Sequence, residues 1–139
     1  MLENRSIPRC TVIPELAYTD IGKALEWLSA AFGFTLRLRI ANHRAQMNVG
    51  DGALALVELP GGQSLPVDIG CSVMVRVENV DQHCARAVQN GAKVIRPPAN
   101  YPYGERQYAA EDFAGRLWKF SQTIADVDPA TWGGTAGER

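Results

Sequence analysis

The chain carries the same structural plan twice, and this repeat constrains its fold more strongly than any other feature. Residues 16–33 run from a strand-like stretch through an amphipathic helical pattern to Gly33. Residues 75–91 follow the same order with one residue fewer and end at Gly91. A repeat of this kind predicts two half-units that each supply half of one site. We therefore expect the functional site where the two half-units meet.

The first half-unit is predicted to contain one strand, one helix and three further strands. Its strands are expected at residues 12–18, 34–40, 43–49 and 53–59. Apolar residues at helical spacing form one face of the intervening helix. Thr19 or Asp20 can cap that helix, because a short side-chain oxygen accepts a bond from a free backbone N–H. The pair Asp51-Gly52 is the strongest hairpin signal in the chain.

The second half-unit repeats the order after a Pro/Gly-rich bridge. A strand is expected at residues 71–77, where valines alternate with other residues, and Asn79 can cap the following helix. Residues 97–104 are expected to form a long loop because they are rich in proline, tyrosine and asparagine. The remaining strands are expected at residues 92–95, 106–111 and 116–122. The boundaries are then module one at about 11–60, a linker at 61–70, module two at about 71–123 and a tail at 124–139.

Length and composition limit the class of protein. With 139 residues, 46% of them hydrophobic and 21% charged, the chain fits one soluble globular domain. A formal net charge of −1 and the lack of a membrane-length apolar run favour neither a nucleic-acid nor a membrane partner. Three cysteines without CxxC spacing argue against a disulfide framework and favour a reducing cytoplasm.

The doubled order of one strand, one helix and three strands resembles the vicinal oxygen chelate superfamily, which contains glyoxalase I, extradiol dioxygenases and bleomycin-resistance proteins. The resemblance is most specific at residues 103–122, which are similar to the YGxRxxxxxDPxGxxW signature of the glyoxalase/bleomycin-resistance-like branch. Phe113 stands where that signature has a proline. The resemblance implies an α+β fold in which two βαβββ modules form a curved mixed sheet, shaped as a cup with the helices outside.

The resemblance also implies four cup-lining positions, where metal-binding members carry His or Gln, Glu, His and Glu. These positions correspond to Ile13, Glu58, Ser72 and Lys119. Only Glu58 matches, because isoleucine cannot ligate a metal and a protonated lysine has no free lone pair. His43 and His83 are each expected to be a surface or hydrogen-bonded histidine, and His83 is expected to face solvent. We therefore predict no metal site and no cofactor, and metal-dependent glyoxalase or dioxygenase activity is disfavoured.

Strand alternation predicts which side chains line the cup, and a slip of one residue would invert a strand's whole set. The predicted ligand-binding residues are Glu15, Leu56, Glu58, Ser72, Met74, Arg76, Tyr103, Arg106, Tyr108 and Lys119. Lys119 is expected to approach Glu58. Aromatic rings and a guanidinium at the mouth suit an aromatic or anionic small molecule. Two alternatives stay open: Glu15 and Arg76 can be solvated rim charges, and the tyrosines can pack on the sheet edge.

Two kinds of function are compatible with this reading. The first is a metal-independent small-molecule binding protein, an antibiotic-resistance-like homodimer that holds its ligand in the cup, with Trp27 as an exposed candidate dimer contact. The second is a metal-independent lyase or isomerase in which a cup carboxylate, Glu58 or Glu15, is the general base. In that case Arg76 or Lys119 would stabilise an oxyanion. The sequence does not identify the ligand or decide whether a reaction is catalysed. It also does not decide whether the cup forms within one chain or between two chains.

Overall fold

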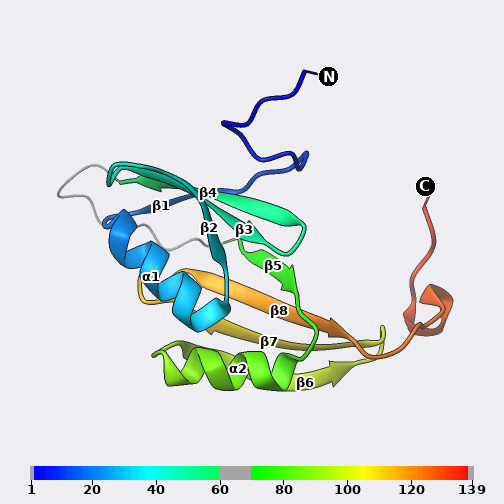
Figure 1. The fold of residues 1–139 in the computed structure, drawn as a ribbon. Helices are drawn as coiled ribbons and strands as arrows, with labels where there is room; N and C mark the ends of the chain where they lie inside the picture. The colour runs from blue at the N-terminus through cyan, green and yellow to red at the C-terminus, as the bar shows by residue number, and fades with distance from the viewer. Residues whose placement is uncertain (1, 60–69, 138–139) are drawn as a thin grey trace.

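The sequence repeat is also a repeat in three dimensions. The computed structural model describes residues 2–59 and 70–137, so most of the predicted linker lies outside the described residues. The first module contains β1 (Glu15–Tyr18), α1 (Ile21–Phe32), β2 (Thr35–Ile40), β3 (Arg44–Val49) and β4 (Gly52–Glu58). The second contains β5 (Val73–Arg76), α2 (Val80–Gln89), β6 (Lys93–Tyr101), β7 (Glu105–Glu111) and β8 (Leu117–Thr123), and a short 3-10 helix, η1 (Pro129–Trp132), follows it (Figure 1).

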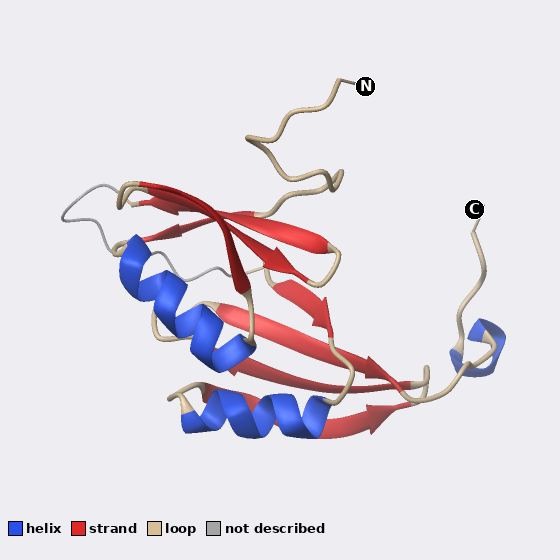
Figure 2. Cartoon of the chain, viewed as in Figure 1, coloured by secondary structure: helices blue, strands red, loops and turns tan. Residues whose placement is uncertain are grey.

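Each module forms its own four-stranded mixed sheet. The strand orders are β1-β4-β3-β2 and β5-β8-β7-β6, so the two sheets are equivalent. In each sheet the module's first strand runs parallel to its last strand, and the other pairs are antiparallel. Figure 2 shows the two sheets with one helix against each. The predicted α+β fold of two βαβββ modules is confirmed, and within the described residues no strand pairing joins the sheets.

The helices begin and end as their capping chemistry predicts. The Asp20 side chain accepts a bond from the backbone N–H of Lys23 at 3.0 Å, and Gly33 ends α1 with φ +78°. The Asn79 side chain accepts in the same way from Gln82 at 3.0 Å. In the described part of the chain, neither helix is long and apolar enough to cross a membrane.

Both modules contribute to one hydrophobic core. Helices α1 and α2 pack against each other, and the core includes the helix-facing side of each sheet. Phe32 at the end of α1 reaches into the second module, where its ring centroid lies 4.8 Å from Phe120 and 5.5 Å from Trp118. Burying one such side chain contributes about 1.5–3 kcal/mol. Because this core lies on the helix-bearing sides, the other face of each sheet points away from it; we call these open face A (first module) and open face B (second module).

Asp112 ties the two modules together from the turn between β7 and β8. Its Oδ2 accepts hydrogen bonds from the Tyr18 hydroxyl at 2.7 Å and from the Trp118 indole at 3.0 Å. Its Oδ1 accepts from two backbone N–H groups of its own turn. Arg116 crosses the same junction and donates to the Ala17 carbonyl at 2.9 Å. The aspartate of the sequence signature therefore has a structural role at the joint between modules.

Phe113, the residue that departs from the signature, also packs in this joint. Its ring centroid lies 5.7 Å from Tyr18 and 5.8 Å from Trp27, and the Lys23 ammonium lies 5.2 Å above it. The Trp27 indole donates to the Asn90 carbonyl at the end of α2, at 2.7 Å. The expectation that Trp27 is exposed is therefore wrong, because both its ring and its N–H have partners within the chain.

Two local predictions were wrong. Strand β6 continues to Tyr101, although residues 97–104 were expected to form a loop. Its prolines are tolerated because β6 is the outer strand of its sheet and its register shifts on both sides of Arg96. The β3–β4 hairpin turns at Gly50 and Asp51, one residue before the predicted pair, and Gly50 has the positive φ of +57° that this turn requires.

Candidate functional site

The residues predicted to line one cup divide among different surfaces. Residues paired across neighbouring strands project from the same face of a sheet, so strand register places each of them. Glu15 pairs with Ala55 on open face A, whereas Met74, Arg76 and Lys119 project from open face B. Ser72 precedes β5 and is exposed, and Tyr103 lies in the turn between β6 and β7. The remaining predicted residues, Leu56, Glu58, Arg106 and Tyr108, project from the helix-bearing sides.

The alternation predicted for β4 is wrong by one residue. Leu56 pairs with Leu16 and is fully buried in the core, and Glu58 pairs with Tyr18 on the same side. Nearly every position of β4 is apolar, so its sequence pattern does not report which face is open. Glu58 and Lys119 therefore project from different sheets, and among the described residues no ion pair joins them.

Arg106 and Tyr108 lie beneath α2 and not at a cup mouth. Both N–H groups of the Arg106 fork donate to the Asp81 carboxylate on α2, each at 2.9 Å. Tyr108 is 2% exposed and pairs with Phe120 in the core, and burial raises the pKa of its hydroxyl. Their expected position at the cup mouth is therefore wrong, because the alternation of β7 directs both side chains to the helix side.

His83 lies between the modules, although it was expected at the surface. Its Nε2 donates to the Phe32 carbonyl at 3.1 Å, and this leaves its Nδ1 to accept from the Tyr108 hydroxyl at 2.5 Å. Its ring also packs 4.2 Å from that of Phe120. Burial is the main cause of a lowered pKa, to which the nearby Arg86 charge adds, and the neutral imidazole suits both hydrogen bonds. His43, in contrast, is exposed, which agrees with its expected role as a surface or hydrogen-bonded histidine.

Open face B presents two cationic side chains at one shallow hollow. Lys119 lies at the centre of its sheet, paired with Met74 on one side and Ala109 on the other. Arg96 pairs with Ala109 from the outer strand. The hollow is lined by Arg96, Tyr101, Gln107, Tyr108, Ala109 and Lys119. Within the described residues neither cation forms an ion pair.

A chain of hydrogen bonds orders the neighbouring part of open face B. The Tyr103 hydroxyl donates to Gln107 at 3.2 Å, and the Gln107 amide donates to the Ser121 hydroxyl at 3.0 Å. Ser121 is 4% exposed and donates in turn to Glu105 at 2.7 Å. This bond is the main cause of a lowered Glu105 pKa, with further contributions from Thr123 and from the charge of Arg76. Glu105 is therefore held as a carboxylate and is a weak base.

Aromatic rings form a rim beside this network. Tyr101 and Tyr103 stack with ring centroids 5.5 Å apart, and Trp132 of η1 lies 5.2 Å from Tyr103. Trp132 is 46% exposed, so part of its ring is free to contact a planar molecule. Sequence reasoning missed Arg96, Gln107 and Trp132 as site residues. The first two follow from the β6–β7–β8 register, which the sequence does not show, and the third was placed in the tail.

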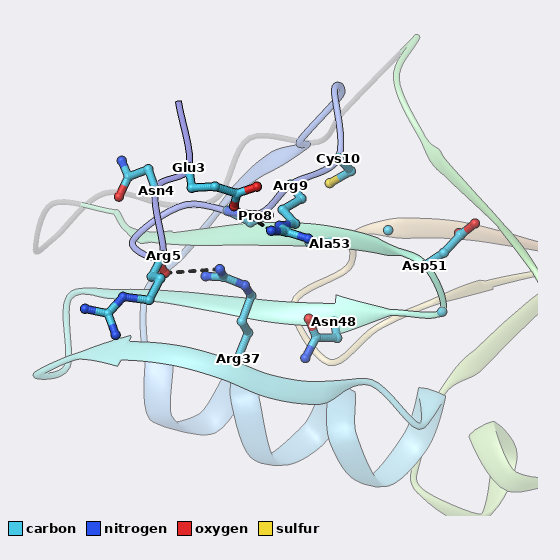
Figure 3. Close-up of a pocket in the computed structure, with 12 residues that line it drawn as sticks. Glu3, Asn4, Arg5, Pro8, Arg9, Cys10, Arg37, Asn48, Asp51 and Ala53 are labelled. Atoms are coloured by element: carbon cyan, nitrogen blue, oxygen red, sulfur yellow. Dashed lines mark hydrogen bonds and ion pairs between the residues drawn. The ribbon is translucent and has the colours of Figure 1, made fainter. Parts of the chain in front are cut away.

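Open face A carries fewer predicted residues and is partly covered by the chain itself. Glu15 forms a 3.4 Å ion pair with Arg44, and both side chains are more than half exposed. Glu15 is therefore a solvated rim charge, as one of the two alternatives proposed. The first dozen residues cross this face and border an open pocket of about 320 Å³ beside the β3–β4 hairpin (Figure 3).

The donor set does not fit the metal that metal-binding members of the resembling superfamily carry. Ile13 and Ser72 lie outside the strands, Glu58 projects toward the helix side and Lys119 carries a cation. In the described ranges, 2–59 and 70–137, no group of three or more His, Cys, Asp or Glu side chains could hold a metal ion. We derive no chemistry through a metal from these residues.

Comparison with known proteins gives a consistent result. The model of the Glyoxalase/Bleomycin resistance protein/Dioxygenase superfamily matches residues 7–120. The crystal structure of TioX from Micromonospora sp. ML1 is 32% identical, covers 86% of this chain and 100% of its own, and has a TM-score of 0.67. A glyoxalase/bleomycin resistance protein from Streptomyces sp. CB03234 is 26% identical over 79% of this chain and 97% of its own, with a TM-score of 0.63. No curated protein matches the chain.

Proposed function

Because the chain belongs to the Glyoxalase/Bleomycin resistance protein/Dioxygenase superfamily, we propose that it is a metal-independent small-molecule binding protein whose ligand lies on open face B. The observation that carries this proposal is that Arg96 and Lys119 both line one small hollow of open face B, beside an aromatic rim. Charged donors without a carboxylate partner favour an anion, and exposed rings favour a planar group. The proposed ligand class is therefore an aromatic anion.

The state of the carboxylates supports binding over lyase or isomerase chemistry. A general base must lie near the reacting proton and have a pKa close to the working pH. Glu58 projects away from both open faces, and Glu15 is exposed and paired with Arg44. Glu105 does project from open face B, but its pKa is lowered by its bond from Ser121. These carboxylates serve better as fixed charges and acceptors than as bases.

A homodimer is the proposed assembly, because each open face alone is only half of a cup. Met74 on open face B is 56% exposed, and Ile40 on open face A is 46% exposed. Large apolar side chains left exposed on a sheet face favour burial against another molecule. A second copy could then close the ligand site. The proposed location is the cytoplasm, whose reducing conditions keep Cys10, Cys71 and Cys84 as the free thiols described here.

The ligand class can be tested with three probes that share one ring system and differ in charge. In calorimetric titrations we expect 2-naphthoate to bind about tenfold more tightly than 2-naphthalenemethanol, and 2-naphthylmethylamine to bind more weakly still. Lys119→Gln and Arg96→Gln should each lower the affinity for 2-naphthoate by about tenfold or more, because each removes one charge-assisted hydrogen bond. Lys93→Gln, on the same strand as Arg96 but outside the hollow, is the matched control. Equal affinity for the three probes would exclude the proposed ligand class.

A further inference from the structure

The first residues of the chain, 2–13, form an arm that crosses open face A. Figure 3 shows this arm beside β2, β3 and β4, with the Arg37 side chain reaching toward its main chain. Pro8 is the buried residue of the arm, and Ile7 is 50% exposed. The core residues begin only at Leu16. The arm is therefore held mainly by polar contacts with the sheet and not by the core.

Two side chains of open face A bind the arm through its backbone alone. One Arg37 nitrogen, Nη2, donates to the carbonyls of Arg5 and Ile7, each at 3.1 Å. The Gln46 amide donates to the Ser6 carbonyl between them at 3.0 Å. Arg37 Nη1 also donates to the Gln46 side-chain oxygen, which orients the amide toward the arm. Three consecutive carbonyls thus meet one preorganised set of donors, which we call the carbonyl clamp.

The geometry of both partners explains why the clamp and the arm fit. The register of β2 shifts between Leu36 and Leu38, and such a bulge re-aims a side chain, here Arg37 toward Gln46. In the arm, the Asn4 side chain accepts from the Ser6 N–H at 3.0 Å, and its carbonyl accepts from Ile7 at 3.4 Å. This turn presents the three carbonyls to the side chains of Arg37 and Gln46.

We propose that the carbonyl clamp is a binding site for the main chain of a peptide turn, which the chain's own residues 5–7 fill in this structure. The partner class is a peptide turn that presents three consecutive carbonyls to these two side chains, with little dependence on its own side chains. Covalent attachment gives the arm a high effective concentration, so a free peptide must compete with it. The site lies on open face A and is separate from the small-molecule site proposed for open face B.

The experiment uses trypsin cleavage after Arg5 in the full chain, followed by mass spectrometry. A docked turn is a poor protease substrate, so cleavage should be slow. The competitor is acetyl-Asn-Ala-Ser-Ile-Pro-Ala-amide, which keeps the turn and its carbonyls but contains no trypsin site. At millimolar concentration it should raise the cleavage rate about threefold or more by displacing the arm. A peptide with Ala in place of its Asn lacks the turn-forming side chain and should have a much smaller effect.

Variants of the clamp residues test whether the carbonyl clamp, and not another contact, protects the bond after Arg5 from trypsin. Arg37→Ala should be cleaved about tenfold faster and should no longer respond to the peptide, with an unchanged melting temperature to show that the fold is intact. Arg39→Ala, two residues along the same strand and bonded to Ala41 and Asn42 instead, should behave like the natural chain. A peptide without effect on the natural chain, or rapid cleavage of the natural chain after Arg5, would overturn the proposal. None of these outcomes depends on a ligand at open face B.

Discussion

The hydroxyl of Tyr18 in the first module donates a 2.7 Å hydrogen bond to the carboxylate of Asp112 in the second. Both groups are buried, and Tyr18 is fully inaccessible. Burial is the main cause of a raised Tyr18 pKa, and the Asp112 charge and hydrogen bond add to it. The phenol therefore stays protonated and remains a donor across the joint.

Tyr18→Phe should lower the free energy of unfolding by about 1–2 kcal/mol, and Asp112→Asn by about 2–4 kcal/mol, because Asp112 accepts from both modules. Urea denaturation measures both changes. The double variant should be less destabilised than the sum, because the two residues share one bond. Strict additivity would show that this bond does not couple the modules. Tyr101→Phe, outside the core, serves as the control.

Stability should fall on mild acidification because of His83. Its folded pKa is lowered from 6.5 by burial, so the unfolded chain binds a proton that the folded chain refuses. This contribution is complete above pH 6.5, decreases as the pH falls toward the folded pKa, and then levels off. The loss between about pH 8 and about pH 5, measured by urea denaturation, should be smaller in His83→Gln. The same loss in His43→Gln and in the natural chain would show that exposed His43 is not the source.

Ser121→Ala should raise the pKa of Glu105 toward its ordinary value, because the bond from Ser121 is the main cause of the lowered pKa. Carbon-detected NMR titration of the Glu105 carboxyl measures this change. The free energy of unfolding should also fall by about 1–2 kcal/mol, since the partly buried Gln107–Ser121–Glu105 chain of hydrogen bonds is broken. Ser72→Ala, at an exposed position before β5, should change neither quantity. An unchanged Glu105 pKa in Ser121→Ala would contradict the assigned cause.

Trp132→Ala should weaken binding of 2-naphthoate by about threefold to tenfold, which corresponds to the loss of one aromatic contact. Removal of the indole leaves Tyr101 and Tyr103 stacked on each other, so the rim persists without its outer ring. Calorimetric titration gives the affinity. Val88→Ala, which shortens an exposed apolar side chain on α2, should leave it unchanged. An unaltered affinity in Trp132→Ala would remove η1 from the proposed ligand site.

Local chemistry explains which parts of the fold could be predicted. Helix α1 begins after Asp20 and ends before Gly33 because capping and periodicity act within a few residues. The continuation of β6 through Pro97 depends on its position at the sheet edge, which is set by distant residues. The doubled plan was visible in the sequence because each module repeats the same local signals.

The candidate site was harder to predict because it depends on register and on packing between elements. Nearly every residue of β4 is apolar, so its sequence does not show which set of alternating side chains faces the core. Leu56 and Glu58 were therefore assigned to the wrong face. The partner of Arg106 lies on α2, and His83 reaches across to the first module. Met74, Arg76 and Lys119 were placed correctly on one face. On β5 and β8 these residues alternate with valines or with large aromatic residues, which marks the buried face of each strand.

The shared aromatic core has a consequence for how this protein can change. The rings of Phe32, His83 and Phe120 pack against one another across the junction between the modules. Neither module buries this apolar surface alone, so neither module is expected to fold by itself. Open faces A and B lie outside this shared core. New recognition chemistry can therefore arise on either face at little cost to folding, while the seam between the halves tolerates few replacements.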